Sequence, residues 1–223
     1  MDKGYFITGT DTSIGKSWCA AALIWKLRQQ GYTVTGMKPI ASGCVETAEG
    51  LRNEDALLLQ QLSSIPMPYD EINPYAFEPA IAPHIAAKQA GIHIDLDVIK
   101  QHFKTLSTHS DFTVVEGVGG WQVPLNNQQT IADLAITLEL PVIMVVGLRL
   151  GCINHALLTA NQIQQSGSHL AGWIANSIEP DMSEQLSNIE TLRDMISAPL
   201  LGTTPYLKQF DQQQMADAIN LKL

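Results

Sequence analysis

Short apolar runs alternate along the chain with longer stretches in which apolar residues recur at helical spacing. The short runs predict strands, at Tyr5–Thr8, Thr33–Lys38, Phe112–Val115, Pro141–Val146, Leu170–Ala175 and Leu200–Thr204. The longer stretches predict helices, at Ser17–Gln30, Glu54–Leu62, Asp95–Leu106 and Asn154–Gln165. Asp95 is the expected N-cap of its helix, and Gly31 and Gly167 follow the expected ends of two others.

Strands that alternate with helices predict an α/β fold, in which a doubly wound, mainly parallel sheet has helices on both faces. The run Pro141–Val146 is apolar at every position, which is typical of a strand buried on both sides. No repeat and no Pro-, Gly- or Ser-rich linker divides the chain, so a single domain is expected over residues 1–223. Ligands of such folds bind at the carboxyl ends of the strands.

Composition excludes several classes of function. The 223 residues are 45% hydrophobic and 16% charged, which excludes disorder as the main state. Thirteen Lys and Arg against 22 Asp and Glu give a net charge of −9, so no nucleic-acid or membrane partner is expected. The apolar run Leu140–Leu148 is far shorter than the ~20 residues of a membrane-spanning helix.

The cysteines and the first residues of the sequence indicate a cytoplasmic protein. Cys19, Cys44 and Cys152 are odd in number and lack metal-ligand spacing, which favours a reduced chain. The segment MDKGYFITGT shows no signal peptide. The six histidines form no ligand pair, and none is assigned to a metal.

The strongest motif is GTDTSIGKS at residues 9–17, between the first strand and the first helix. A phosphate loop needs small residues whose backbone N–H groups converge on phosphate oxygens, a Lys that reaches the β- and γ-phosphates, and a hydroxyl for Mg²⁺. Lys16 and Ser17 fill the two side-chain roles. Gly9 lies one residue earlier than the common spacing requires. A structural turn with a surface Lys would leave three hydroxyl residues of the loop unexplained, namely Thr10, Thr12 and Ser13.

Two acids are candidates for holding Mg²⁺, which prefers one or two carboxylates together with phosphates and waters. Glu116 ends a strand and precedes Gly117, Val118 and Gly119, where glycines permit close approach of a ligand. Asp55 has an equally good alternative, because an acid in the first turn also stabilises a helix.

Lys38 follows the second strand, which is expected to lie next to the first. It could bind an anionic substrate or stabilise phosphoryl charge during transfer. The alternative is a surface Lys with no ligand.

With these residues identified, the sequence resembles the dethiobiotin synthetase family over nearly its whole length. The motifs are GTDTSIGKS (9–17), KPIASG (38–43), EGLRNEDAL (49–57), NPYAF (73–77), VVEGVGGW (114–121), LPVIMVVGLRLGCINHALLTA (140–160), AGWIAN (171–176) and APLLG (198–202). The resemblance implies a P-loop NTPase-type fold. It also implies an ATP- and Mg²⁺-dependent ring closure that converts 7,8-diaminononanoate and CO₂ into dethiobiotin, ADP and phosphate, through a carbamate and a carbamic-phosphoric mixed anhydride.

The resemblance also implies roles for individual residues. Thr12, Lys16 and Lys38 would be catalytic, and Ser17, Asp55 and Glu116 would hold Mg²⁺. The nucleotide would further contact Ser13, Ile14, Gly15, Trp18, Gly117, Gly119, Asn176, Pro205, Tyr206 and Leu207. The substrate would contact Thr12, Lys38 and Ser42, together with Gly151, Cys152, Ile153 and Asn154 of the second subunit of a homodimer. Residues 179–195 and 211–223 match no motif.

The sequence disfavours three other classes of protein that have a phosphate loop. Amidoligase-like enzymes on the same phosphate-loop fold, such as a cobyrinic acid amide synthase, need a glutamine-handling domain with a nucleophilic Cys, for which 223 residues leave no room. Partitioning and cell-division ATPases have a second Lys early in the loop, where this chain has Asp11, and tend to have a basic patch or amphipathic tail. An inactive paralogue would not be expected to keep Lys16, Lys38, Asp55 and Glu116.

Overall fold

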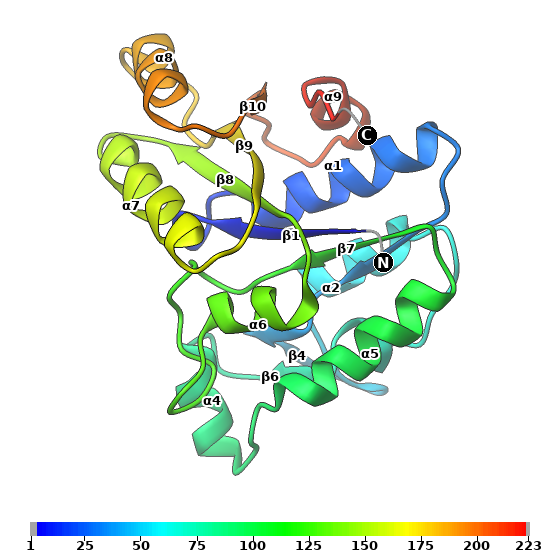
Figure 1. The fold of residues 1–223 in the computed structure, drawn as a ribbon. Coiled ribbons are helices and arrows are strands. Elements are labelled where there is room, and N and C mark those ends of the chain that lie inside the picture. The colour runs from blue at the N-terminus through cyan, green and yellow to red at the C-terminus, as the bar shows by residue number, and fades with distance from the viewer. Residues whose placement is uncertain (1–3, 222–223) are drawn as a thin grey trace.

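A six-stranded parallel sheet runs through the centre of the molecule in the computed structural model, which describes residues 4–221 (Figure 1). Its order is β10-β9-β8-β1-β7-β2, with all neighbours parallel. The strands are β1 (Gly4–Gly9), β2 (Val34–Met37), β7 (Phe112–Glu116), β8 (Val142–Leu148), β9 (Leu170–Ser177) and β10 (Leu200–Thr204). These are the six strands predicted from the sequence, and the α/β fold is confirmed.

Each face of the sheet has its own apolar core, because successive side chains of a strand point to opposite faces. Phe6 belongs to one core and Ile7 to the other, and Val115 and Val114 divide in the same way. The helices are α1 (Lys16–Gln29), α2 (Glu54–Leu62), α3 (Tyr69–Ile72), α4 (Pro83–Ala90), α5 (Leu96–Thr108), α6 (Ile131–Leu138), α7 (Cys152–Gln165), α8 (Gln185–Met195) and α9 (Gln212–Asp217). Helices α1 and α9 cover one face, and α5, α6 and α7 cover the other (Figure 1).

The expectation that the second strand lies next to the first is wrong. Strand β7 lies between β1 and β2 and pairs with both. The local pattern of a strand does not determine its neighbour, because each of these strands is apolar on both faces. All the strands still end at the same edge of the sheet. Glu116, the last residue of β7, therefore comes between the loop after β1 and Lys38 after β2.

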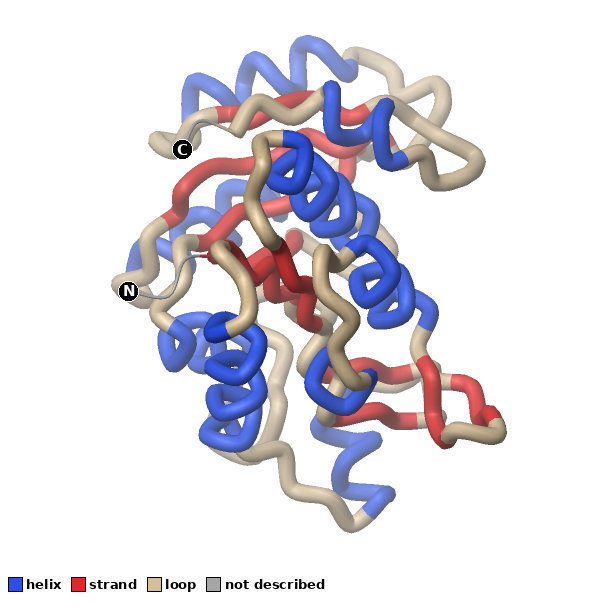
Figure 2. Tube along the Cα trace, turned by 90° about the vertical axis from the view of Figure 1, so that its right-hand side faces the viewer, coloured by secondary structure: helices blue, strands red, loops and turns tan. Residues whose placement is uncertain are grey.

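Four short strands lie outside the central sheet. Strand β3 (Ile40–Ser42) pairs parallel to β6 (Tyr75–Phe77), and β4 (Val45–Thr47) pairs antiparallel to β5 (Gly50–Arg52). In Figure 2 they lie together, away from the central sheet. These pairs fix the path of the chain between β2 and α4.

Local signals at helix ends are confirmed where the sequence showed them. The Asp95 side chain accepts a hydrogen bond from the Asp97 N–H at the start of α5. Gly31 and Gly167 adopt left-handed conformations just after α1 and α7. The last segment packs on α1, where Gln213 Oε1 accepts from Trp25 Nε1 at 3.1 Å. Within residues 4–221, no helix is both long and apolar enough to cross a membrane.

Candidate active site

The segment 9–17 turns tightly between β1 and α1, as expected of a phosphate loop. Ser13 and Gly15 both have positive φ, 57° and 83°, and reverse the direction of the chain. Lys16 is 6% exposed, and its Nζ donates to the Asp11 carbonyl at 2.7 Å. The Asp11 carboxylate pairs with Arg149, which follows β8. The loop is therefore held in shape by its own lysine.

Asn176 supports this loop from the carboxyl end of β9. Its Nδ2 donates to the Ile14 carbonyl at 2.7 Å, and its Oδ1 accepts from Thr204 Oγ1 at 2.5 Å. A Cβ atom on Gly15 would lie 2.1 Å from Asn176 Nδ2, so only glycine leaves room for this contact. The amide keeps one N–H and one oxygen lone pair for another partner.

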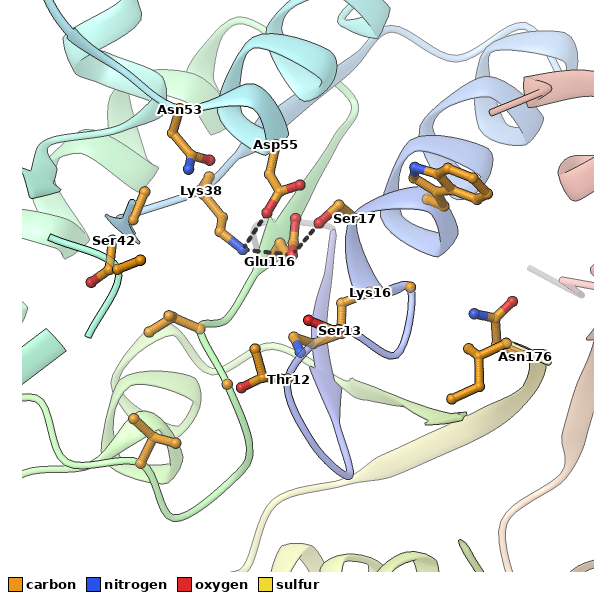
Figure 3. A pocket seen from close by; sticks show the side chains of 18 of the residues that line it. Thr12, Ser13, Lys16, Ser17, Lys38, Ser42, Asn53, Asp55, Glu116 and Asn176 are labelled. Atoms are coloured by element: carbon orange, nitrogen blue, oxygen red, sulfur yellow. Dashed lines mark hydrogen bonds and ion pairs between the residues drawn. The ribbon is translucent and has the colours of Figure 1, made fainter. Parts of the chain in front are cut away.

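Lys38 joins the two candidate metal-binding acids. Its Nζ lies 2.6 Å from Glu116 Oε1 and 3.6 Å from Asp55 Oδ2 (Figure 3). Ser17 Oγ donates to the same Glu116 oxygen at 2.8 Å. Residues from the ends of β2 and β7 and from the first turns of α1 and α2 therefore meet at one point, as the sequence predicted for the carboxyl edge of the sheet.

Burial governs the charges in this cluster. Burial lowers the pKa of Lys38, but the carboxylates of Glu116 and Asp55 outweigh it, and the net shift is upward. Burial raises the pKa of Glu116, and Lys38 opposes that shift. The raised pKa of Lys38 favours an ionised pair, whereas the effect of burial on Glu116 favours a neutral carboxylic acid. The 2.6 Å contact between Lys38 Nζ and Glu116 Oε1 favours the ionised pair.

Lys16 differs from Lys38 because no carboxylate of residues 4–221 forms an ion pair with its ammonium group. Burial, followed by repulsion from Lys38, lowers the pKa of Lys16 to about 8. An anion beside this side chain would remove both penalties by pairing with the charged form.

The cluster also fits a divalent cation. Glu116 Oε2 is buried and has no hydrogen-bond partner in the described part of the chain, and Asp55 is 44% exposed at the side of the pocket. Among residues 4–221, no three His, Cys, Asp or Glu side chains gather closely enough to hold a metal on their own. Two carboxylates and a Ser hydroxyl suit Mg²⁺ when nucleotide phosphates supply further ligands.

A pocket of about 790 Å³ opens over this cluster. Predicted site residues that line it are Thr12, Ser13, Gly15, Lys16, Ser17, Trp18, Lys38, Ser42, Asp55, Glu116, Gly119, Asn176, Pro205, Tyr206 and Leu207. Ile14 lies 1% exposed in the core, so only its backbone could meet a ligand. Gly117 is also buried, and its carbonyl accepts from Lys38 Nζ at 3.2 Å.

The four residues 151–154 lie outside this pocket, at the start of α7. Gly151 has φ 94°, and Cys152 is buried with its Sγ 3.9 Å from Asn188 Oδ1. Leu150, just before this turn, is 97% exposed. The structure of one chain therefore does not bring residues 151–154 to the cluster of Lys16 and Lys38.

Several lining residues were not expected from the sequence. They are Ala41, Asn53, Ala80, Ile81, Ala82, Pro83, Val118, Val123, Ser177 and Ile178. Most are apolar side chains without a chemical signal of their own. Asn53 did carry a signal, since an Asn just before a helix is a typical N-cap. Its side chain accepts from the Ala56 N–H at 3.2 Å.

Comparison with known proteins is consistent with this geometry. A family model described as an AAA domain matches residues 3–214. The ATP-dependent dethiobiotin synthetase BioD of Pseudomonas aeruginosa is 46% identical over 219 residues, which are 98% of this chain and 96% of the relative. The enzyme of the same name from Cellvibrio japonicus is 49% identical over 92% of this chain and 90% of its own.

The chain belongs to the dethiobiotin synthetase family. It is accordingly an ATP-dependent ligase of biotin biosynthesis. Solved structures that it resembles include MinD of Aquifex aeolicus, with a TM-score of 0.57 at 14% identity, over 97% of this chain and 87% of that one. A ParA family ATPase of Chlorobium tepidum has a TM-score of 0.57 at 12% identity, over 98% of this chain and 91% of that one. These likenesses show the P-loop NTPase fold alone.

Glu116→Gln and Asp55→Asn are each expected to raise the Mg²⁺ concentration for half-maximal activity of this dethiobiotin synthetase, by about tenfold. Each amide keeps the shape of the side chain and removes the charge that attracts the cation. Glu54→Gln is the matched control, because Glu54 is exposed beside Asp55 in the same turn of α2. Titration of activity with Mg²⁺ measures the shift. An unchanged midpoint for either variant would remove that residue from the metal site.

Nucleotide affinity is expected to fall about tenfold between pH 7 and pH 9. With a pKa of about 8, Lys16 is mostly charged at the lower pH and mostly neutral at the higher one. The charged form of Lys16 is predicted to pair with the phosphates, so deprotonation should weaken binding as the pH rises. Calorimetry with ATP in EDTA tests this, since no metal then titrates. An affinity that stays flat across this range would contradict the assignment, because Lys38 has a raised pKa and stays charged.

Proposed function

We propose that this protein closes the ureido ring of dethiobiotin from 7,8-diaminononanoate, CO₂ and Mg·ATP. The observation that supports it is one pocket in which a phosphate loop, two buried lysines and two carboxylates converge. A partitioning-type ATPase has its second lysine within the loop, where this chain has Asp11, so it does not account for a buried lysine at the end of β2. A reaction that joins a carbamate to the γ-phosphate does, because both partners are anions that must approach each other.

The reaction proceeds in three bond-forming steps. One amine of the substrate attacks CO₂ and loses a proton, which gives a carbamate. A carbamate oxygen then attacks the γ-phosphorus, the bond to ADP breaks, and a carbamic-phosphoric mixed anhydride forms. The second amine attacks the carbonyl carbon, loses a proton and expels phosphate, and the five-membered cyclic urea is complete.

The side chains act mainly by position and charge. Lys16 and Lys38 flank the carbamate and the transferring phosphoryl group, and Thr12 contacts the substrate from the loop. Ser42, whose Oγ is buried and has no partner within the described chain, holds the polar end of the substrate. Bound Mg²⁺, held by Ser17, Asp55 and Glu116, would neutralise charge on the phosphates.

The other end of the pocket accommodates the nucleotide base. Asn176 lines it with one N–H and one lone pair to spare, which suits the adenine edge. The segment 205–207 and Trp18 form walls, and the backbone of residues 13–17 surrounds the phosphates. Gly117 and Gly119 leave room beside Glu116.

Product formation tests the proposed function directly. Purified protein with ATP and Mg²⁺ is expected to release ADP only when both 7,8-diaminononanoate and bicarbonate are present, and mass spectrometry is expected to detect dethiobiotin. Lys16→Ala serves as the inactive control. ADP release that ignores the diamine would contradict the proposal and would favour a partitioning-type ATPase.

The proposal includes a homodimer whose active sites are shared. Residues 151–154 lie outside the pocket of their own chain, and the exposed Leu150 precedes them. Backbone N–H groups at the start of α7 would bind the carboxylate of the substrate held in the partner subunit's pocket.

Asn154→Asp is expected to raise the diamine KM about tenfold, ~1.4 kcal/mol, with the ATP KM little changed. The added charge would repel the substrate carboxylate. At diamine concentrations below the wild-type KM, where Asn154→Asp alone is weakly active, mixing its subunits with Lys16→Ala subunits should restore about a quarter of wild-type activity, because half the dimers then hold one intact site. A mixture no more active than its two components would show that the site is not shared.

A further inference from the structure

A buried chain of hydrogen bonds runs behind the pocket through Tyr69. The Asn53 backbone N–H donates to Tyr69 Oη at 2.8 Å, and the Tyr69 hydroxyl donates to Asn73 Oδ1 at 3.0 Å. Asn73 Nδ2 in turn donates to the Lys38 carbonyl at 2.6 Å. Tyr69 is 8% exposed and Asn73 is 2% exposed, so water does not readily substitute for a lost partner.

The two ends of this chain are the backbone supports of two site residues. Asn53 is the N-cap of α2, whose first turn holds Asp55. At the other end, Lys38 is further fixed by its N–H, which donates to the Ile72 carbonyl at 2.9 Å. The Asp55 and Lys38 side chains meet at 3.6 Å in the pocket. The distance between these two groups therefore depends on a connection that passes through one phenol hydroxyl.

We propose that Tyr69 is a positioning residue that sets Lys38 and Asp55 against Glu116. This inference rests on the proposed function, because it assigns Tyr69 a part in the same site. Neither Tyr69 nor Asn73 lines the pocket, so both act through other residues. Loss of the hydroxyl would leave the Asn53 N–H and Asn73 Oδ1 unpaired. Both groups would then move to find partners and would carry Asp55 and Lys38 with them.

Tyr69→Phe isolates the hydroxyl from the ring. The Arg52 guanidinium lies 4.2 Å from the ring centre, a contact that phenylalanine keeps. We expect kcat for ring closure to fall about tenfold or more, because small misplacements of charged groups are costly at this step. The ATP KM, measured at saturating Mg²⁺, should change by less than about twofold, since Tyr69 does not line the pocket.

Tyr75→Phe is the matched control. Its hydroxyl accepts a hydrogen bond from the Asp95 N–H at 3.0 Å, at the start of α5 and outside this chain of bonds. The two variants lose the same atom from neighbouring elements. Full activity is expected of Tyr75→Phe. An equal loss of kcat in both variants would overturn the proposal, because it would show general destabilisation.

Affinity for Mn²⁺ gives a second readout that needs no catalysis. Mn²⁺ stands in for Mg²⁺, and its binding to the protein–ADP complex can be followed by electron paramagnetic resonance. Tyr69→Phe should weaken it about threefold to tenfold, since Asp55 is displaced. Wild-type affinity and wild-type kcat would overturn the proposal, as would a lower melting temperature with unchanged Mn²⁺ affinity.

Failure of the proposed function can be distinguished from failure of the proposal about Tyr69. If the wild-type protein forms no dethiobiotin, the proposed function fails, while the Mn²⁺ comparison of Tyr69→Phe with Tyr75→Phe still decides whether Tyr69 positions Asp55. The variant Asn73→Ala tests whether Tyr69 acts on Lys38 through Asn73. Combining it with Tyr69→Phe should lower kcat little beyond the worse single variant, because both cut the same connection to Lys38. Fully additive losses would overturn the connection.

Discussion

Replacing Lys38 with alanine is expected to abolish turnover and to leave Mg·ATP binding nearly intact. Lys38 lies beside the phosphate loop, and its charge faces Glu116 and Asp55. Its proposed task is to neutralise charge as the phosphoryl group transfers. Removal of a cation with this task lowers kcat by at least about a thousandfold. Calorimetry with a non-hydrolysable ATP analogue, paired with a product assay, measures the two quantities separately.

The same substitution has a cost in stability that must be separated from its effect on catalysis. Without Lys38, the carboxylate of Glu116 stays buried without its partner, which costs about 3–5 kcal/mol. Adding Glu116→Gln should recover much of this stability and none of the activity. Lys88→Ala, on the exposed last turn of α4, is the control for loss of a positive charge. Lost ATP binding in a folded Lys38→Ala protein, or retained turnover, would refute the proposed role.

The central sheet and the residues at its edge could be predicted because their signals are local. Each buried strand is a continuous apolar run, and parallel strands deliver their last residues to a common edge whatever their order. For this reason the error in the predicted strand order did not affect the prediction of which residues meet at the site. Lys38 and Glu116 were expected near the loop, and they meet at 2.6 Å.

The remainder of the site has no local signal. Tyr69 and Asn73 become neighbours of Lys38 only when β3 pairs with β6 and brings their segments together. Strands of this length are too short for alternation to be visible. Helix α6 was missed for a different reason, because its sequence IADLAITL is a short, mostly apolar run of eight residues, and periodicity alone does not distinguish such a run from a buried strand. These features depend on tertiary contacts.

Gly15→Ala is expected to weaken nucleotide binding about a hundredfold, or ~2.7 kcal/mol. The new Cβ would lie 2.1 Å from Asn176 Nδ2, so the amide must turn away. The Ile14 carbonyl and the Thr204 hydroxyl then lose their partner, and the loop loses its support at the position where phosphates bind. Isothermal titration with ADP and Mg²⁺ measures the loss.

A substitution at a second glycine distinguishes the effect of this contact from the effect of backbone strain. Gly31 also has a positive φ, 92°, but an added Cβ would meet nothing within 4 Å. Both alanine variants should lose about 1–2 kcal/mol of stability from the left-handed conformation, and only Gly15→Ala should lose nucleotide affinity. In the double variant Gly15→Ala with Asn176→Ala the clash is absent, so its affinity should match that of Asn176→Ala alone. If the two losses add in full, the contact between Gly15 and Asn176 is not what excludes a side chain at this position of the loop.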